Sequence, residues 1–193
     1  MSEISRRDWI AAMSVAAVAL RPTGAQAEAA RAAVAAPVPS GASAPPKIYT
    51  PHEWQTVRTL VDYLFPRDER SGSATDALVP EFMDQMLHLE PGMRTAHRGG
   101  LAWLDSECRE RFGATFVAAT DAQRREMLDL IAFPARAPAE LSHGVRWFNS
   151  FRDLAATGFW TSEIGVQDIG YMGNTPQMTW NGCPSENLRR LGF

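Results

Sequence analysis

Apolar residues at helical spacing, divided by prolines and glycines, constrain the fold of this 193-residue chain more than any other feature. The segment Thr50-Pro51-His52-Glu53 is a capping box, in which the threonine hydroxyl and the glutamate carboxylate satisfy backbone N–H groups at the start of a helix. After it, apolar residues recur every three or four positions until Pro66 ends the run: Trp54, Val57, Leu60, Val61, Leu64 and Phe65. This pattern predicts a helix over residues 51–65.

Four further segments have the same spacing, each bounded by proline, glycine or a second capping box at Thr120: about residues 80–90, 93–112, 120–133 and 139–156. The last of these is expected to end at Gly158. Glycine inside a helix costs roughly 1 kcal/mol relative to alanine, so Gly99-Gly100 predicts that another helix approaches closely there. Because no segment alternates with period two for long, we predict an all-α fold, a single bundle of about five helices.

The segment that follows these helices, residues 159–193, has a different pattern. Its glycines and large aromatic residues show no periodicity, which predicts a long irregular C-terminal tail. Such a segment either wraps over the bundle or presents anchors to the surface of a partner. Trp and Tyr are enriched at the energetic centres of protein interfaces, so we favour the second reading, with Trp160, Tyr171 and Trp180 as anchors.

The first 27 residues have the layout of a bacterial export signal. Arg6-Arg7 precede a weakly apolar, alanine-rich run over residues 10–20, and Ala25-Gln26-Ala27 closes it. The run is shorter than the roughly 20 residues that a spanning helix needs. This layout is typical of a twin-arginine signal. We expect cleavage between Ala27 and the next residue, with rival small-residue sites nearby: Ala30, Ala33 and Ala36.

Composition of the remaining chain limits its partners. The whole chain has a net charge of −3, its single lysine is Lys47, and no basic stripe is present, which argues against nucleic-acid binding. After the signal, no apolar run is long enough to span a membrane. Residues 28–47 are rich in Ala, Pro and Ser and are expected to be a disordered linker. Residues 48–193 then form one helical domain.

A search for catalytic and cofactor-binding motifs finds none. His52-Glu53 begins a zinc-binding H-E-x-x-H, but residue 56 is threonine. The C-x-x-C-H, G-x-G-x-x-G and G-x-S-x-G patterns are missing, and His88, His97 and His143 are expected on helix surfaces or at caps. We therefore predict no catalytic, cofactor or metal residue on this chain. The twin-arginine translocase carries folded proteins, so a cofactor-binding partner becomes the expected cargo.

The two cysteines differ in their expected surroundings. Cys108 lies on the apolar face of its helix, whereas Cys183 lies in a turn between Gly182 and Pro184. An exported protein can form disulfides, so either a Cys108–Cys183 bridge or a bridge from Cys183 to another chain is possible. We favour the second, because an unpaired exposed thiol is unusual outside the cytoplasm.

Several segments together resemble the gluconate 2-dehydrogenase subunit 3 family. Three lie in the tail, and the others lie at 79–82, 100–105 and 143–149: the tail segments are Thr161-Ser162-Glu163-Ile164-Gly165-Val166, Asp168-Ile169-Gly170-Tyr171-Met172-Gly173-Asn174 and Trp180-Asn181-Gly182-Cys183-Pro184. The resemblance runs from about Thr50 to Phe193. It implies a small, non-catalytic subunit of a periplasmic sugar or sugar-acid dehydrogenase complex, peripheral to the inner membrane.

The same resemblance implies the partners. They are a large FAD flavoprotein of the glucose–methanol–choline type, a multihaem cytochrome c, and the twin-arginine translocase, through which the large subunit leaves as a passenger. The expected partner-binding residues are in the tail: Trp160, Gly165, Asp168, Tyr171, Asn174 and Trp180. Cys183 is implied to link covalently to the large subunit. The alternatives are a stand-alone periplasmic enzyme and a ligand-binding helical module. The sugar oxidised is not implied, because substrate selectivity lies on the large subunit.

Overall fold

The structure is a computed structural model, and it describes residues 24–35, 45–171, 173, 178–179, 182–183 and 185–192. Over these residues it contains eight α-helices, one short 3-10 helix and no strand. The all-α prediction is therefore confirmed for the described part of the chain. Arg6-Arg7, Asn174 and Trp180 lie outside the described residues.

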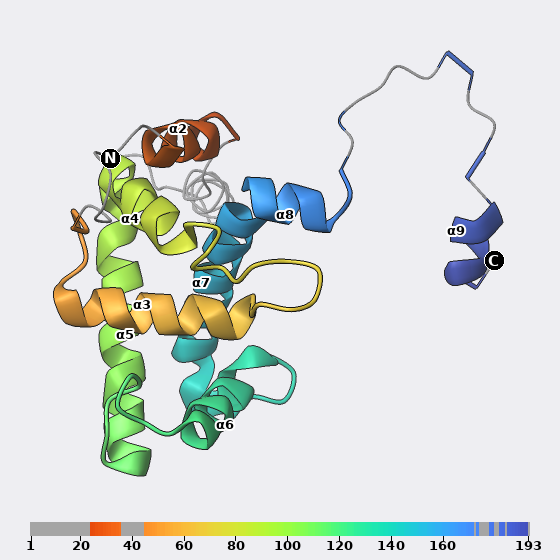
Figure 1. The fold of residues 1–193 in the computed structure, drawn as a ribbon. Coiled ribbons are helices and arrows are strands. Elements are labelled where there is room, and N and C mark those ends of the chain that lie inside the picture. The colour runs from red at the N-terminus through yellow and green to blue at the C-terminus, as the bar shows by residue number, and fades with distance from the viewer. Residues whose placement is uncertain are drawn as a thin grey trace, which may run out of the picture.

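The five predicted helices correspond to α3 to α7, and α2, α8 and α9 are additional (Figure 1). The helices in chain order are α2 (Gly24–Ala35), α3 (Pro51–Leu64), α4 (Val79–Leu89), α5 (Pro91–Phe112), α6 (Asp121–Ala132), η1 (Ala139–Leu141), α7 (Ser142–Trp160), α8 (Glu163–Asp168) and α9 (Ser185–Arg190). None of the helices in the described ranges is both long and apolar enough to cross a bilayer.

Both capping boxes form as predicted. The Thr50 hydroxyl accepts a hydrogen bond from the backbone N–H of Glu53 at 3.3 Å, and the Glu53 carboxylate accepts one from the Thr50 N–H at 2.8 Å. Thr120 and Gln123 repeat this arrangement at the start of α6. Local sequence therefore sets where α3 and α6 begin.

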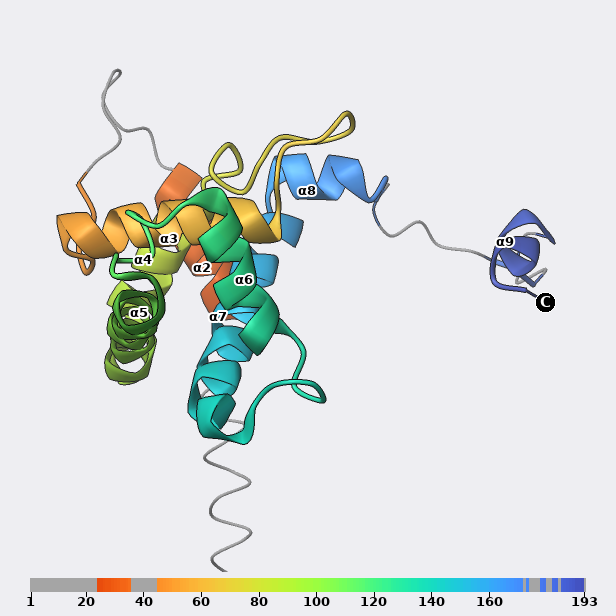
Figure 2. The ribbon, with the colours of Figure 1, turned by 90° about the horizontal axis from the view of Figure 1, so that it is seen from below.

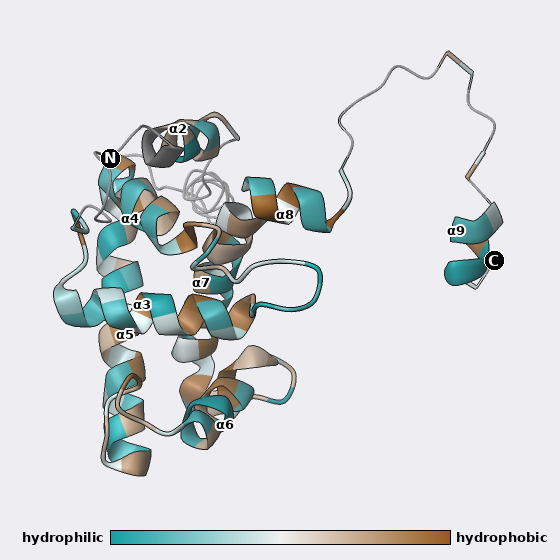
Figure 3. Ribbon diagram, viewed as in Figure 1, coloured by the Kyte–Doolittle hydropathy of each residue, from teal (hydrophilic) through white to brown (hydrophobic). Residues whose placement is uncertain are grey.

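The long helix α7 is the centre of the fold, since α3, α4, α5, α6 and α8 all pack against it. Figure 2 shows the same helices from a second direction. In Figure 3 polar and apolar residues alternate along the helices, as in amphipathic helices. The largest buried side chains include Phe148 and Phe151 of α7 and Phe82 of α4.

Gly100 and Gly144 allow α5 and α7 to approach each other closely, as the glycine pair in α5 predicted. A Cβ atom on Gly100 would overlap the indole of Trp147, and one on Gly144 would overlap the indole of Trp103. The Trp147 indole N–H donates to the carbonyl oxygen of His97 at 3.1 Å. Each helix thus provides a glycine that receives a tryptophan from the other.

The expected end of the last predicted helix at Gly158 is wrong, because α7 continues to Trp160. A Cβ atom on Gly158 would lie 2.8 Å from the Phe82 ring of α4. The glycine therefore permits a close approach between helices and does not end the helix. A helix-ending glycine and a packing glycine look the same in a single sequence.

Residues 28–35, the first part of the expected linker, instead belong to α2, which packs on α4. Alanine has the highest intrinsic helix propensity, and the small side chains of Ala27 and Ala30 are buried against the core. Low hydrophobicity was the reason to expect disorder. In the structure, α2 instead packs on the core through these small side chains.

Candidate partner-binding site

An aromatic cluster closes the bundle at the C-terminal end of α7. The rings of Phe65 and Phe159 stack with centroids 4.7 Å apart, and Trp160 meets Phe159 edge-on at 5.0 Å. Phe159 is buried, whereas Trp160 is 38 % exposed. Trp160 therefore has one side fixed by the core and another open to a partner.

The turn between α7 and α8 has a fixed geometry. The Ser162 hydroxyl donates to the carbonyl oxygen of Phe159 at 2.6 Å and accepts from the N–H of Gly165 at 3.0 Å. A Cβ atom on Gly165 would collide with the Phe159 carbonyl. Gly165 is buried, and its lack of a side chain lets the start of α8 lie against the end of α7.

Asp168 fixes the far end of α8 to the loop that follows α3. Its carbonyl oxygen accepts from the Arg70 guanidinium at 2.6 Å, and its carboxylate lies 3.4 Å from the same group. The Asp168 side chain is 17 % exposed. Asp168 therefore holds α8 in place from within the chain.

Exposed apolar side chains recur along the described part of the tail after α8. Ile169 is 56 % exposed, Tyr171 53 %, Met178 95 % and Leu191 72 %. Figure 1 draws α9 apart from the bundle. The described part of the tail is therefore not part of the core, and its exposed apolar side chains are candidates for contact with a partner.

The structure therefore gathers Trp160, Gly165, Asp168 and Tyr171 at one end of the molecule, around the α7–α8 junction. Two of them, Trp160 and Tyr171, present exposed aromatic surface, and the other two position the helix between them. The predicted partner-binding residues Asn174 and Trp180 lie outside the described residues.

The two cysteines are free, Cys108 buried and Cys183 exposed. Burial, with smaller contributions from Asp105 and Glu107, raises the pKa of the Cys108 thiol to about 11. Cys108 is therefore neutral and poorly reactive near neutral pH, as its predicted place on an apolar helix face implied.

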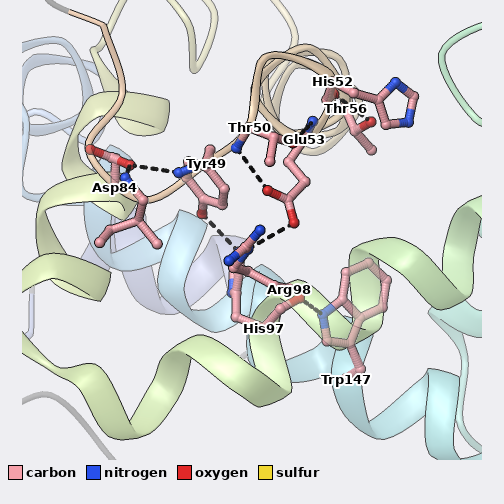
Figure 4. Close-up of polar contacts among 10 residues, drawn as sticks. Tyr49, Thr50, His52, Glu53, Thr56, Asp84, His97, Arg98 and Trp147 are labelled. Carbon is pink, nitrogen blue, oxygen red and sulfur yellow. Dashed lines mark hydrogen bonds and ion pairs between the residues drawn. The ribbon is translucent and has the colours of Figure 1, made fainter.

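A buried polar network ties the segment before α3 to α4 and α5 (Figure 4). The Asp84 carboxylate accepts from the backbone N–H groups of residues 47, 48 and 49 at 2.8, 2.9 and 3.3 Å. The Tyr49 hydroxyl lies 2.8 Å from Nε2 of His97. Burial lowers the pKa of His97 to about 4, so the imidazole is neutral near neutral pH.

His97 was expected on a helix surface or at a cap, and this expectation is wrong, because the residue is 7 % exposed. It stacks on Phe151 of α7 at 5.3 Å. Nearby, burial raises the pKa of Glu53, but hydrogen bonds from Arg98 and Thr50 outweigh it and leave the pKa lowered. Each member of this network has a structural partner, so the network serves the fold.

A groove of about 500 Å³ lies between α5 and α7. Its lining includes Trp103, Trp147, His143 and Arg146. The Trp103 indole nitrogen is buried without a hydrogen-bond acceptor. Over the described residues, no three His, Cys, Asp or Glu side chains are close enough together to hold a metal ion.

Comparison with known proteins identifies one family. Residues 51–179 match the family model described as gluconate 2-dehydrogenase subunit 3, a stretch that begins with α3, includes α8 and ends just before Trp180 and Cys183. No curated protein and no solved structure matches the chain. Since the matched residues cover well over half of the sequence, this chain belongs to the gluconate 2-dehydrogenase subunit 3 family.

Proposed function

We propose that this chain is the small, non-catalytic subunit of a periplasmic, FAD-dependent gluconate or sugar dehydrogenase complex. Its family is named for a subunit of gluconate 2-dehydrogenase. The observation that carries the proposal is a rigid α7–α8 junction followed by exposed apolar residues. In this arrangement the bundle holds the start of the tail in place, and the tail binds the flavoprotein subunit.

The contacts at the junction support tail docking. Ser162 and Asp168 hold α8 by hydrogen bonds and an ion pair within the chain. Binding beside an element that is already held in place costs less conformational entropy than binding that must first order a free segment. Trp160 and Tyr171 then offer large aromatic contact area with few rotatable bonds.

Export is the second part of the proposal. Arg6-Arg7 and the alanine-rich run after them have the layout of a twin-arginine signal. A translocase that carries folded proteins would move the flavoprotein, with its FAD already bound, as a passenger on this chain. Electrons would then pass from the FAD to a multihaem cytochrome c on the membrane.

The export proposal is tested by Arg6→Lys with Arg7→Lys in the same chain. Dehydrogenase activity and FAD-bound large subunit should remain in the cytoplasm, while both subunits are still made. Arg21→Lys is the matched control, because it keeps the arginine pair and changes another arginine of the same segment. Normal periplasmic activity in the double variant would exclude the passenger mechanism.

We further propose that Cys183 forms a disulfide with the large subunit. The thiol is exposed and lies in the tail, whereas Cys108 is buried in α5. Non-reducing electrophoresis of the purified complex should give one band at the summed mass, which Cys183→Ser abolishes and Cys108→Ser retains. Two separate bands from the unmodified complex would contradict this link.

A ligand-binding module is the second candidate function. It is favoured by one observation, the groove between α5 and α7, whose lining includes Trp103 and Trp147. Such a groove fits a small molecule with an apolar body. Native mass spectrometry of the purified chain tests this candidate, since a bound small molecule that is lost in Trp103→Phe would support it.

A further inference from the structure

Helix α2 occupies a defined place on the folded domain. It packs on α4 and also contacts α7 (Figure 1). Ala30 is fully buried and Ala27 is 8 % exposed. These residues are three apart and therefore lie on one face of the helix, while Ala25, Glu28 and Ala29 are exposed. The helix is thus docked by its alanine face.

Arg31 joins this docked helix to two distant parts of the chain. Its guanidinium donates to the carbonyl oxygens of Ala77, at 3.3 Å, and Gly158. It also lies over the Phe82 ring, 4.8 Å from the ring centroid. Ala77 precedes α4 and Gly158 belongs to α7, so these acceptors are adjacent only when the core has folded. Docking of α2 therefore depends on the folded core.

The docked helix contains the predicted cleavage site. The Ala25-Gln26-Ala27 motif lies in its first turn, and the Gln26 amide donates to the Glu90 carboxylate. Peptidases bind their substrates as extended strands. The bond between Ala27 and Glu28 can then be cut only after α2 has left α4 and unwound.

We propose that docking of α2 on α4 and α7 protects the Ala27–Glu28 bond from proteolysis, so that N-terminal processing is limited by how often α2 opens. Where opening and closing are fast, the cleavage rate is proportional to the open fraction. The biological meaning of this protection rests on the proposed export signal, whereas the protection itself does not.

Elastase, which cuts after small residues, tests the protection on the purified full-length chain. Its rate of cutting within residues 25–31 is compared with its rate on a synthetic peptide of residues 20–36, with the cut sites identified by mass spectrometry. We expect the chain to be cut at least about tenfold more slowly than the peptide. Equal rates would overturn the proposal.

Two matched variants separate docking from local sequence. Ala30→Glu places a charge in the buried contact, and Ala29→Glu places the same charge on the exposed face of α2. The cleavage rate of Ala30→Glu should lie within about threefold of the rate of a peptide with the same substitution. The cleavage rate of Ala29→Glu, relative to its own peptide, should stay as low as that of the unmodified chain. Equal protection in the two variants would contradict docking as the cause.

Elastase cleavage within α4 would show that Ala30→Glu disturbs the core. In that case Arg31→Ala provides a second test. It removes the bonds to Ala77 and Gly158 without adding a buried charge, and it should accelerate cutting of α2 while α4 stays intact. Unchanged protection would overturn the proposal. None of these measurements needs export, so a failed arginine-pair experiment and a failed protection experiment are distinguishable.

Discussion

The core around α7 and the tail after α8 contain similar kinds of large apolar residues in opposite surroundings. Phe151 in the core is fully buried and Phe148 is 2 % exposed, whereas Tyr171 is 53 % exposed and Met178 95 % exposed. Hydrophobic side chains therefore do not by themselves build a core. They must be presented at a spacing that lets another element cover them, and the described tail residues lack that spacing.

The difference has a local cause. The core helices approach closely at small residues such as Gly100, which receives the Trp147 indole. After α8, Gly170 has a φ of +65°, which is open to glycine but strained for other residues, so the helix does not continue past it.

The largest expected effect separates the two regions by stability. Phe151→Ala should lower the free energy of unfolding of the isolated subunit by about 4 kcal/mol, because it removes a fully buried ring and leaves a cavity. Tyr171→Ala in the same isolated subunit should change it by less than about 0.5 kcal/mol. Chemical denaturation monitored by circular dichroism measures both, and equal losses would place Tyr171 in the core.

The second effect is a pH dependence that belongs to the core. Burial lowers the pKa of His97 from 6.5 to about 4, so below pH 6.5 the unfolded chain binds a proton that the folded chain does not. Stability should fall as the pH drops from about 6.5 to 4, by about 3 kcal/mol from this residue. The stability that depends on a neutral His97 is fully present above pH 6.5.

Comparison with His97→Gln isolates this contribution from that of the carboxylates. The variant removes the titrating group, so its loss of stability between pH 6.5 and 4 should be smaller than that of the unmodified subunit. Urea unfolding at several pH values gives both curves. Parallel curves would mean that His97 is protonated at the same pH in both states.

The third effect concerns the close approach of α5 and α7. Gly100→Ala should destabilise the subunit by about 2 to 3 kcal/mol, because the added methyl group overlaps the Trp147 indole. Its neighbour is the matched control, since Gly99 is exposed and nothing lies within 4 Å of its Cβ position. Gly99→Ala should stabilise by about 0.5 to 1 kcal/mol. Thermal unfolding of both variants would show opposite shifts.

The smallest effect is confined to the complex. Tyr171→Ala should weaken binding to the flavoprotein subunit by about 2 kcal/mol if the ring is an interface anchor, with no matching loss of stability in the isolated subunit. Binding is measured with purified subunits under reducing conditions, which remove any covalent link. Unchanged affinity would argue that the tail is not the docking surface.

Short-range features of the sequence predicted where α3 and α6 begin. The capping boxes at Thr50 and Thr120 form as expected, since each needs only residues within one turn. The glycine pair in α5 correctly predicted a close helix approach. The motifs around residues 161–174 pointed to the family, and the family match over residues 51–179 confirms it.

Tertiary structure decided what depends on distant residues. Gly158 lies inside α7, where the missing side chain leaves room for Phe82, which is far away in the sequence. His97 is buried because Tyr49 and Phe151 lie against it, and α2 lies on the core through contacts of Arg31 with Ala77 and Gly158. Local sequence determines which backbone N–H groups are capped, whereas burial depends on which elements meet, and these meet only when the whole chain has folded.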